Sequence, residues 1–395
     1  MSDTLDMAAA KTAPADEELI RSARELAPRI AERAAEVADM RKPHDDTIQE
    51  LVEAGIVQMF VPRRWGGSEA SFSTMYDVLE PIAAACPSTG WIASFYIIHN
   101  TYIAKFPEET QEEVFSKKGY TLLPTGFAPD LQARRVDGGW RISGKAIWGS
   151  GIMHADWVML TGPTPEGDRS FLLPVEEVEM KDVWFFTGMS GTGSNDFVAD
   201  DVFVPDARTI TREEFFESNS EGTRVHANPM YRMPFFIAAY CTILPVVTGA
   251  YLGAVRAYEK IVENKRQAYT GNPLKEHQGT HMLVGEFEIA LEVARTLSRA
   301  VYARAEEVLA GKGEYDLEHR LKAKELTAYL SDLCRHSANR IMSVAGSSSF
   351  HNDQTVQRIW RDLNTVCSHA FWELGVTREL VGRHRLGFEP NNPLV

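Results

Sequence analysis

The sequence has few cysteines, and none of them stands in a pairing pattern. Its 395 residues include Cys86, Cys241, Cys334 and Cys367, and no two of these form a CxxC spacing. Disulfide frameworks and structural zinc sites need closely and regularly spaced cysteines. Because no signal peptide is recognisable either, we expect a cytoplasmic protein rather than a disulfide-stabilised secreted one.

Further absences narrow the function classes. An uninterrupted apolar run of membrane-spanning length is missing, so we expect no transmembrane helix. No HExxH motif and no Cys/His ligand spacing occurs, so we expect no metal, although a site made of His99, His154 and His369 stays open as an alternative. A nicotinamide fingerprint is also absent. The net charge of −14, with both signs mixed along the chain, argues against a nucleic-acid or anionic-membrane partner.

Hydrophobic patterning divides the chain into three blocks. Near the N-terminus, Leu19, Ala23, Leu26, Ile30 and Ala34 recur at three- and four-residue steps, which is the spacing of an amphipathic helix. Short apolar runs broken by Gly and Asp follow, which are typical of strands, and long helical periodicity then returns. The predicted class is α+β, with a disordered N-terminus (1–14), an N-terminal helical domain (15–118), a small central β-barrel or sandwich (119–215), a linker (216–233) and a C-terminal four-helix bundle (234–395).

One segment of the β-region is unusual. In IWGSGIMHADW, residues 147–157, Ser150 stands between two glycines and directly after Trp148-Gly149. Glycine lets other groups approach the backbone closely, and a serine between glycines presents its hydroxyl with few steric neighbours. The segment is therefore a candidate binding site, and a turn with a β-bulge is the alternative interpretation.

Four local patterns, taken together, resemble the acyl-CoA dehydrogenase superfamily. They are FVPRRWGG (60–67), TGMSGTGSNDFVADDVFVP (187–205), KRQAYTGNPLKEHQ (265–278) and VQRIWRDL (356–363). The patterns occur in the superfamily's order, and the likeness covers nearly the whole chain beyond residue 15. The resemblance implies a helical domain, a small β-domain and a helical bundle in that order.

Within the superfamily the chain resembles the oxygenase components of two-component flavin monooxygenases, of the 4-hydroxyphenylacetate hydroxylase type. Acyl-CoA dehydrogenases usually carry a glutamate base where this chain has NTVCSHAFWE, with His369 near the position of that base. The monooxygenases carry a histidine on the buried fourth helix, matched by His99, and a serine matched by Ser150.

The resemblance implies an enzyme that uses reduced flavin and O2. A C4a-hydroperoxyflavin would hydroxylate an aromatic, most simply phenolic, substrate. The implied cofactor is reduced FMN, with FAD as the alternative. The implied partners are a separate NAD(P)H:flavin reductase that supplies the reduced flavin and further copies of this chain, in a homotetramer whose flavins lie between protomers.

The same resemblance assigns catalytic roles to two residues. Ser150 would accept a hydrogen bond from the flavin N5–H, and His369 would be the base for a phenol or the hydrogen-bond partner of its oxygen. Histidine suits this task because its pKa lies near neutrality. For each histidine the plain alternative is a hydrogen-bonded core or helix-end residue.

Binding residues follow by position. The candidate substrate contacts are His99, Thr125, Arg232, Phe235, Phe371 and Trp372. The candidate flavin contacts are Trp148, Gly149, Ser150, Gly191, Thr192, Gly193, Ser194, Arg266, Gln278, Ser347 and Ser348. Of these, residues 191–194 would offer backbone N–H groups to a phosphate, and the last four would reach the flavin across a subunit boundary.

Three other functions stay open. An acyl-CoA dehydrogenase with an unusual base would hold oxidised FAD and reduce a dye with an acyl-CoA. An N- or S-oxygenating or indole-oxidising relative would keep the Ser150 role but not the phenol-directed histidine. A flavin-binding or structural protein would show no turnover.

Overall fold

The computed structural model describes residues 15–392, so the predicted disordered segment 1–14 lies outside the described residues. The first block is helical, as expected. Its helices are α1 (Asp16–Met40), α2 (Asp45–Glu53), α3 (Phe72–Ala85), α4 (Pro87–Ile103) and α5 (Glu108–Phe115).

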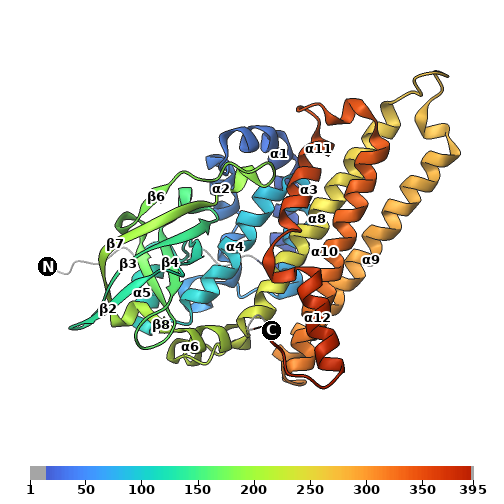
Figure 1. Cartoon of the computed structure of the whole chain (residues 1–395). Helices are drawn as coiled ribbons and strands as arrows, with labels where there is room; N and C mark the ends of the chain where they lie inside the picture. The colour runs from blue at the N-terminus through green and yellow to red at the C-terminus, as the bar shows by residue number, and fades with distance from the viewer. Residues whose placement is uncertain (1–14, 393–395) are drawn as a thin grey trace.

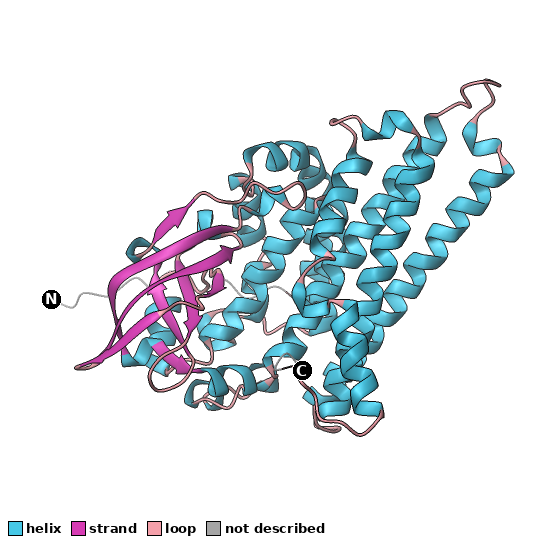
Figure 2. Cartoon of the chain, in the orientation of Figure 1, coloured by secondary structure: helices cyan, strands magenta, loops and turns pink. Residues whose placement is uncertain are grey.

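The central region consists of two four-stranded sheets (Figure 2). One has the order β1-β4-β5-β8 and the other β2-β3-β7-β6. The strands are β1 (Thr125–Phe127), β2 (Gln132–Val136), β3 (Gly139–Gly149), β4 (Trp157–Gly162), β5 (Arg169–Pro174), β6 (Glu179–Lys181), β7 (Asn195–Pro205) and β8 (Thr209–Thr211). Trp140 and Phe197 of one sheet share a buried core with Leu160 and Phe171 of the other. The sandwich expectation therefore holds, whereas the closed-barrel alternative is wrong for the described residues, because each sheet keeps two edge strands.

The C-terminal region is a bundle of long helices. They are α8 (Phe235–Asn264), α9 (Gln278–Leu309) and α10 (Leu317–Ala345), followed by the shorter α11 (Thr355–Val366) and α12 (Leu374–Arg385). Gly346, at φ +87°, separates α10 from the turn η9 (Ser347–Phe350). Within the described residues α8 alone is long and apolar enough to span a membrane, which the sequence analysis missed, but its apolar window is entirely buried in the protein.

The predicted linker (216–233) and the four residues before it contain short helices. These are α6 (Arg212–Glu217), α7 (Glu221–Arg224) and the 3-10 turn η7 (Pro229–Arg232). Thr211 and Glu214 form a capping box that begins α6, and Phe215 and Phe216 of this helix are buried. The polar composition of the segment hid these local signals.

Helix α4 lies between the sheets and the bundle (Figure 1). Pro87 begins it, and all but one of its seventeen residues are buried. The helix contacts α3, α8 and α11 as well as the 3-10 turn η5 (Ser190–Thr192) that leads into β7. The expectation that this apolar helix is internal is correct, and it places Trp91 and His99 between the β-region and the helical domains.

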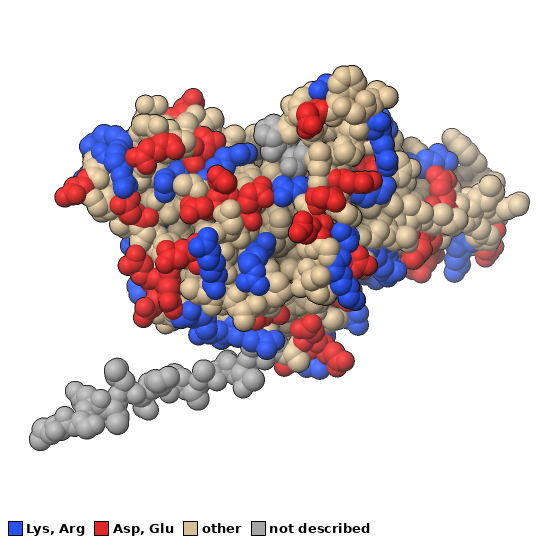
Figure 3. Space-filling model, turned by 90° about the horizontal axis from the view of Figure 1, so that it is seen from below, with Lys and Arg blue, Asp and Glu red and all other residues tan. Residues whose placement is uncertain are grey.

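The surface carries both signs of charge. On the face shown in Figure 3, Lys and Arg side chains are interspersed with Asp and Glu, so no extended area of one sign forms on that face. This distribution accords with the mixed charge pattern of the sequence.

Candidate active site

The Gly-Ser-Gly segment ends β3 at a strained corner. The register with β7 shifts between Ala146 and Gly149, so the strand does end in a bulge, as the alternative interpretation had it. Trp148 adopts φ +61°, a conformation that costs free energy for a residue with a Cβ and that concentrates at functional sites. Trp148 is 54% exposed, and its indole lies edge-on to Trp184 and Phe186. An open aromatic surface therefore lies two residues from Ser150.

The two glycines around Ser150 are required by protein packing. A Cβ on Gly149 would lie 2.7 Å from the Phe197 ring, and one on Gly151, at φ +81°, would lie 2.5 Å from the Tyr96 hydroxyl. Tyr96 donates a hydrogen bond to the Gly151 carbonyl at 2.6 Å. The reason given from the sequence, close approach of a ligand to glycine backbone, is therefore not what these contacts show.

The Ser150 hydroxyl is buried and has protein partners. Trp91 Nε1 donates to Ser150 Oγ at 3.1 Å, and Ser194 Oγ lies 2.7 Å from the same oxygen. Ser194 in turn contacts Thr192 Oγ1 at 2.7 Å. The hydroxyls of Thr192 and Ser194 are thus committed to Ser150 and to each other, which differs from their expected place beside a flavin phosphate.

A closed circuit of aromatic contacts joins the two candidate histidines. Each neighbouring pair in the circuit has ring centroids between 4.7 and 6.3 Å apart. Its members are, in order, Trp91, Phe95, His99, Tyr102, Phe235, Phe371 and His369. The circuit brings together helix α4, the start of α8 and the segment before α12, and it begins at the tryptophan that contacts Ser150.

His99 is a buried hydrogen-bond acceptor at one nitrogen. Its ring stacks between Phe95 and Tyr102, and Nδ1 lies 2.5 Å from the Leu123 carbonyl oxygen. Because a carbonyl only accepts, Nδ1 carries the proton and Nε2 of the neutral ring is an acceptor. Burial lowers the pKa of His99 to about 4, although the Leu123 hydrogen bond opposes this shift. The ring is therefore neutral at pH 7.

His369 has the opposite arrangement. The backbone N–H of Phe371 donates to His369 Nδ1 at 3.2 Å, so the side chain caps the 3-10 turn η10 (Ala370–Trp372). The proton of the neutral ring must then lie on Nε2, which becomes a donor. Burial lowers the pKa of His369 to about 4. This geometry supports the second of its two predicted roles, hydrogen-bond partner of the substrate oxygen, over that of base.

The remaining substrate candidates divide into two groups. Trp372 stacks on His369 at 4.5 Å, and its indole N–H is buried without a partner among the described residues. Phe371 and Phe235 belong to the aromatic circuit, and Thr125 begins β1, two residues after the Leu123 carbonyl that holds His99. Arg232, by contrast, is exposed and donates to the His226 and Ala227 carbonyls of its own loop, so it does not join the others.

The segment NTVCSHAFWE (364–373) contains one carboxylate, and this carboxylate already accepts backbone hydrogen bonds. Glu373 is exposed and accepts hydrogen bonds from the N–H groups of Gly375 and Val376 at the start of α12, which lower its pKa. A helix-capping carboxylate with a lowered pKa is a poor base. The segment therefore offers no substitute for the glutamate base of an acyl-CoA dehydrogenase.

The predicted flavin contacts of the bundle gather at one end of it. Lys265 Nζ donates to the Ala345 carbonyl and to Ser348 Oγ at 2.7 and 3.2 Å, which ties the α8–α9 connection to η9. Arg266 and Gln278 lie in or after that connection, and Ser347 and Ser348 lie in η9. Figure 1 shows both connections at the upper end of the bundle, away from the sheets. The structure thus separates these residues from Trp148 and Ser150 of the same chain.

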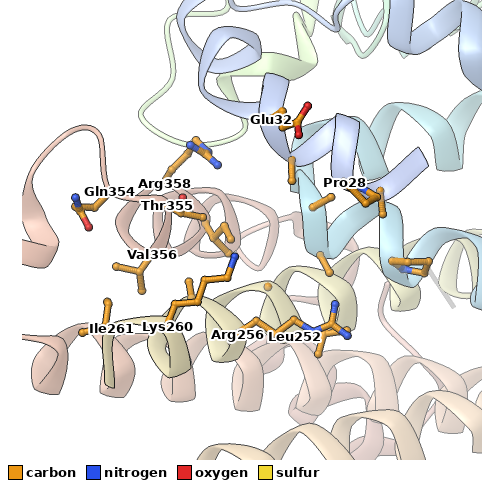
Figure 4. Close-up of a pocket in the computed structure, with 18 of the residues that line it drawn as sticks. Pro28, Glu32, Leu252, Arg256, Lys260, Ile261, Gln354, Thr355, Val356 and Arg358 are labelled. Carbon is orange, nitrogen blue, oxygen red and sulfur yellow. The ribbon is translucent and has the colours of Figure 1, made fainter. Parts of the chain in front are cut away.

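A cavity of about 1220 Å³ adjoins this end of the bundle. Figure 4 shows Lys260 and Arg256 extending from α8, and Arg358 on α11 lines the same cavity. Ser348 and Lys265 also line the cavity, and the buried Nε of Arg358 has no partner among the described residues. The cavity offers cationic donors suited to a phosphate, although the carboxylates of Glu32, Asp77, Glu80 and Asp353 line it too.

The residues present fit a flavin. Ser150 keeps one lone pair beyond its two protein contacts, Trp148 presents an open ring surface, and the Trp372 indole N–H is an orphaned buried donor. A flavin has a flat apolar ring system with polar edges and a phosphate tail, and aromatic surface, isolated polar groups and cationic donors match these parts.

Sequence reasoning missed several of these groups. Trp91, Phe95 and Tyr102 were assigned only to an apolar helix. Positions 91, 95, 99 and 102 follow one another at steps of three to four residues, which places all four side chains on one side of that helix. Across residues 15–392 no group of three or more His, Cys, Asp and Glu side chains is arranged to hold a metal ion. His154 instead pairs with Asp45 at 2.8 Å.

Comparison with known proteins agrees with the fold along the chain. The N-terminal domain of acyl-CoA dehydrogenases matches residues 13–118, and the C-terminal domain matches residues 241–373. A pigment production hydroxylase of Rhodococcus sp. is 36% identical over 96% of this chain and 98% of its own length. The flavin-dependent monooxygenase, oxygenase subunit HsaA, of Mycobacterium tuberculosis is 30% identical over 94% of this chain and 95% of its own length.

A solved structure matches equally well. The crystal structure of 3-HSA hydroxylase from Rhodococcus sp. RHA1 has a TM-score of 0.89 at 30% identity, and the match covers 96% of this chain and 99% of that one. The sequence, the fold and the site thus lead to one family: the chain belongs to the oxygenase components of flavin-dependent aromatic monooxygenases, which share the acyl-CoA dehydrogenase fold and use reduced flavin.

Proposed function

We propose that this oxygenase component hydroxylates a phenolic compound. The observation that carries the proposal is the aromatic circuit, which links the Ser150 contact to the buried His99 and the half-buried His369, two histidines of opposite hydrogen-bonding capacity. Reduced flavin, when bound, supplies the two electrons that activate O2, so that one oxygen atom enters the substrate and the other leaves as water.

At the flavin end, Ser150 would accept the hydrogen of the reduced flavin N5. The serine is only 8% exposed, and burial strengthens a hydrogen bond because water does not compete for it. Trp148 would cover part of the ring system. The Lys and Arg side chains that line the cavity at the end of a helical bundle would hold the flavin phosphate. FMN is the preferred form in this proposal because the site has no residue that we assign to an adenine.

At the substrate end, the two neutral histidines would bind one phenolic hydroxyl. A phenol O–H both donates and accepts, so it would donate to Nε2 of His99 and accept from Nε2–H of His369. The donor at His369 would stabilise the negative charge that develops on the phenolic oxygen as the ring is attacked. Phe95, Tyr102 and Phe371 would pack against the substrate ring.

Several partners follow from this function. An oxygenase component receives reduced flavin from a separate flavin reductase. A homotetramer with flavins between protomers is part of the proposal, and it is supported by the separation of the flavin contacts within one chain. Met282, Ile289 and Val293 of α9 and Tyr329 of α10 also leave large apolar side chains exposed. A cytoplasmic location is proposed as well, and the four cysteines are free and buried thiols.

An isotope experiment tests the activity. The protein is mixed with chemically reduced FMN, 18O2 and a panel of phenols, indoles and thioethers, and the products are analysed by mass spectrometry. We expect a phenol to gain one 18O atom. A panel in which only sulfur or nitrogen compounds are oxygenated would replace the proposal with the N- or S-oxygenating alternative, and dye reduction by an acyl-CoA would indicate a dehydrogenase.

A variant pair tests the Ser150 role in the same assay. Ser150→Ala should raise the share of O2 released as H2O2 while flavin still binds. Ser190→Ala is the matched control, because the Ser190 hydroxyl donates to the Ala38 carbonyl and does not contact Ser150. An unchanged ratio of H2O2 to product in Ser150→Ala would contradict the role.

A further inference from the structure

A row of buried hydroxyl groups ends at Ser150. Thr192 Oγ1, Ser194 Oγ and Ser150 Oγ follow one another at 2.7 Å per step. All three side chains are nearly or fully buried, with 1%, 2% and 8% exposure. Water is therefore largely excluded, and the hydroxyls must satisfy one another.

The two ends of the row fix the direction of every hydrogen in it. Thr192 donates its only hydroxyl hydrogen to the Met189 carbonyl at 2.8 Å, because a carbonyl has none to give. Ser194 must therefore donate to Thr192, and Ser150 must donate to Ser194. At the other end the Trp91 indole N–H occupies one lone pair of Ser150 Oγ. Ser150 is left with no free hydrogen and one free lone pair.

The terminal acceptor is held rigidly. The Met189 carbonyl also accepts from Trp184 Nε1 at 2.9 Å, and the Met189 N–H donates to Asp362 Oδ1 at 2.5 Å. Met189 itself adopts φ +56°. The buried carboxylate of α11 thus fixes the peptide on which the row depends, so the hydrogen directions do not easily reverse.

We propose that Thr192 and Ser194 are positioning residues that make Ser150 a hydrogen-bond acceptor only, so that the site selects reduced flavin over oxidised flavin. Reduced flavin carries a hydrogen on N5 and donates it, whereas the N5 of oxidised flavin is a bare acceptor. A lone pair of Ser150 therefore attracts the first form and repels the second. The inference rests on the proposed contact between Ser150 and N5.

This inference predicts an effect that simple damage to the site would not produce. In Thr192→Val, Ser194 loses its acceptor and can donate to Ser150 instead. The Ser150 hydrogen then becomes free to donate to the N5 of oxidised flavin. Removing a hydroxyl that lies two hydrogen bonds away from Ser150 should therefore tighten the binding of oxidised flavin, whereas a merely structural defect would weaken the binding of both forms.

The experiment measures the dissociation constants of oxidised FMN and, under anaerobic conditions, of reduced FMN for each variant. A hydrogen bond contributes about 0.5–1.5 kcal/mol net. We therefore expect Thr192→Val and Ser194→Ala to lower the ratio of the dissociation constant of oxidised FMN to that of reduced FMN about 2- to 10-fold. Thr192→Ser keeps the hydroxyl and should retain the wild-type ratio. Ser190→Ala, in the same turn but outside the row, is the control.

The outcomes distinguish the inference from the function on which it rests. If Ser150→Ala weakens reduced FMN while Thr192→Val and Ser194→Ala leave the ratio unchanged, the role of the row is wrong and the contact with N5 stands. If Ser150→Ala changes neither dissociation constant, the proposed contact itself is wrong. Equal weakening of both flavin forms in Thr192→Val would also overturn the inference.

Discussion

Replacing His369 with asparagine separates the two tasks of this side chain. His369 Nδ1 accepts the Phe371 N–H at 3.2 Å and so caps η10, whereas Nε2–H is available to the substrate. Asparagine is among the best N-cap residues, and its Oδ1 lies near the position of the histidine Nδ1. The His369→Asn variant should therefore keep the cap and lose the donor.

The size of the effect follows from that geometry. A hydrogen bond to a charged group contributes about 1.5–3 kcal/mol. Since about 1.4 kcal/mol corresponds to a factor of ten, kcat/KM for hydroxylation of a phenol should fall about 10- to 150-fold. The free energy of unfolding should change by less than about 0.5 kcal/mol, because an N-cap is replaced by an N-cap.

The assay compares product formation with stability in two variants. His369→Gln reaches further and supplies an amide N–H near the position of Nε2, but it is a poorer cap. We expect this variant to retain more activity than His369→Asn and to unfold more easily in denaturant. Undiminished hydroxylation by His369→Asn would refute the donor role, and a loss of stability as large as the loss of activity would refute the separation of tasks.

Three further predictions concern stability and assembly. Because the pKa of His99 is lowered to about 4 by burial, the unfolded chain binds a proton that the folded chain does not between pH 6.5 and 4, and stability falls as pH falls through this window. The free energy of unfolding, measured with denaturant, should fall between pH 7.5 and 5, and this fall should be about 2 kcal/mol smaller in His99→Phe than in wild type. Equal falls in the two proteins would argue against the lowered pKa of His99. Gly151→Ala should lower the free energy of unfolding by about 2–4 kcal/mol, because the residue has a left-handed φ and the new Cβ would clash with Tyr96. Gly138→Ala is the control: this residue has φ +75° but lies in open space, so the same assay should show a loss of only about 1–2 kcal/mol. Ile289→Glu, on the exposed apolar face of α9, should reduce the oligomer mass measured by light scattering; an unchanged mass would place the interface elsewhere.

The local sequence was sufficient to predict those elements whose burial follows from their apolar composition. The apolar run that begins at Pro87 predicted a buried helix, and this helix places His99 inside the protein. Ser150 was singled out by its local context, because it stands between two glycines. His369 was assigned only through the resemblance, which places it near the position of the superfamily's glutamate base.

Contacts between distant segments were not predictable in the same way. Thr192 and Ser194 were assigned to a phosphate because a Gly-rich turn suggests exposed N–H groups, yet their side chains point into the interior toward a serine some 44 positions earlier. The glycines beside Ser150 were assigned to a ligand, although Phe197 and Tyr96 require them. In both cases the deciding partner comes from another strand or helix.

The sequence by itself determined the order of helical and β-regions and the burial of α4, and its resemblance to a family pointed to His99, Ser150 and His369 as candidate site residues. Tertiary structure alone decided which nitrogen of each histidine carries its proton and which way the hydroxyl hydrogens point. Those choices depend on a carbonyl, an N–H or an indole brought in from elsewhere in the fold, and hydrogen bonds are satisfied only after the chain has packed.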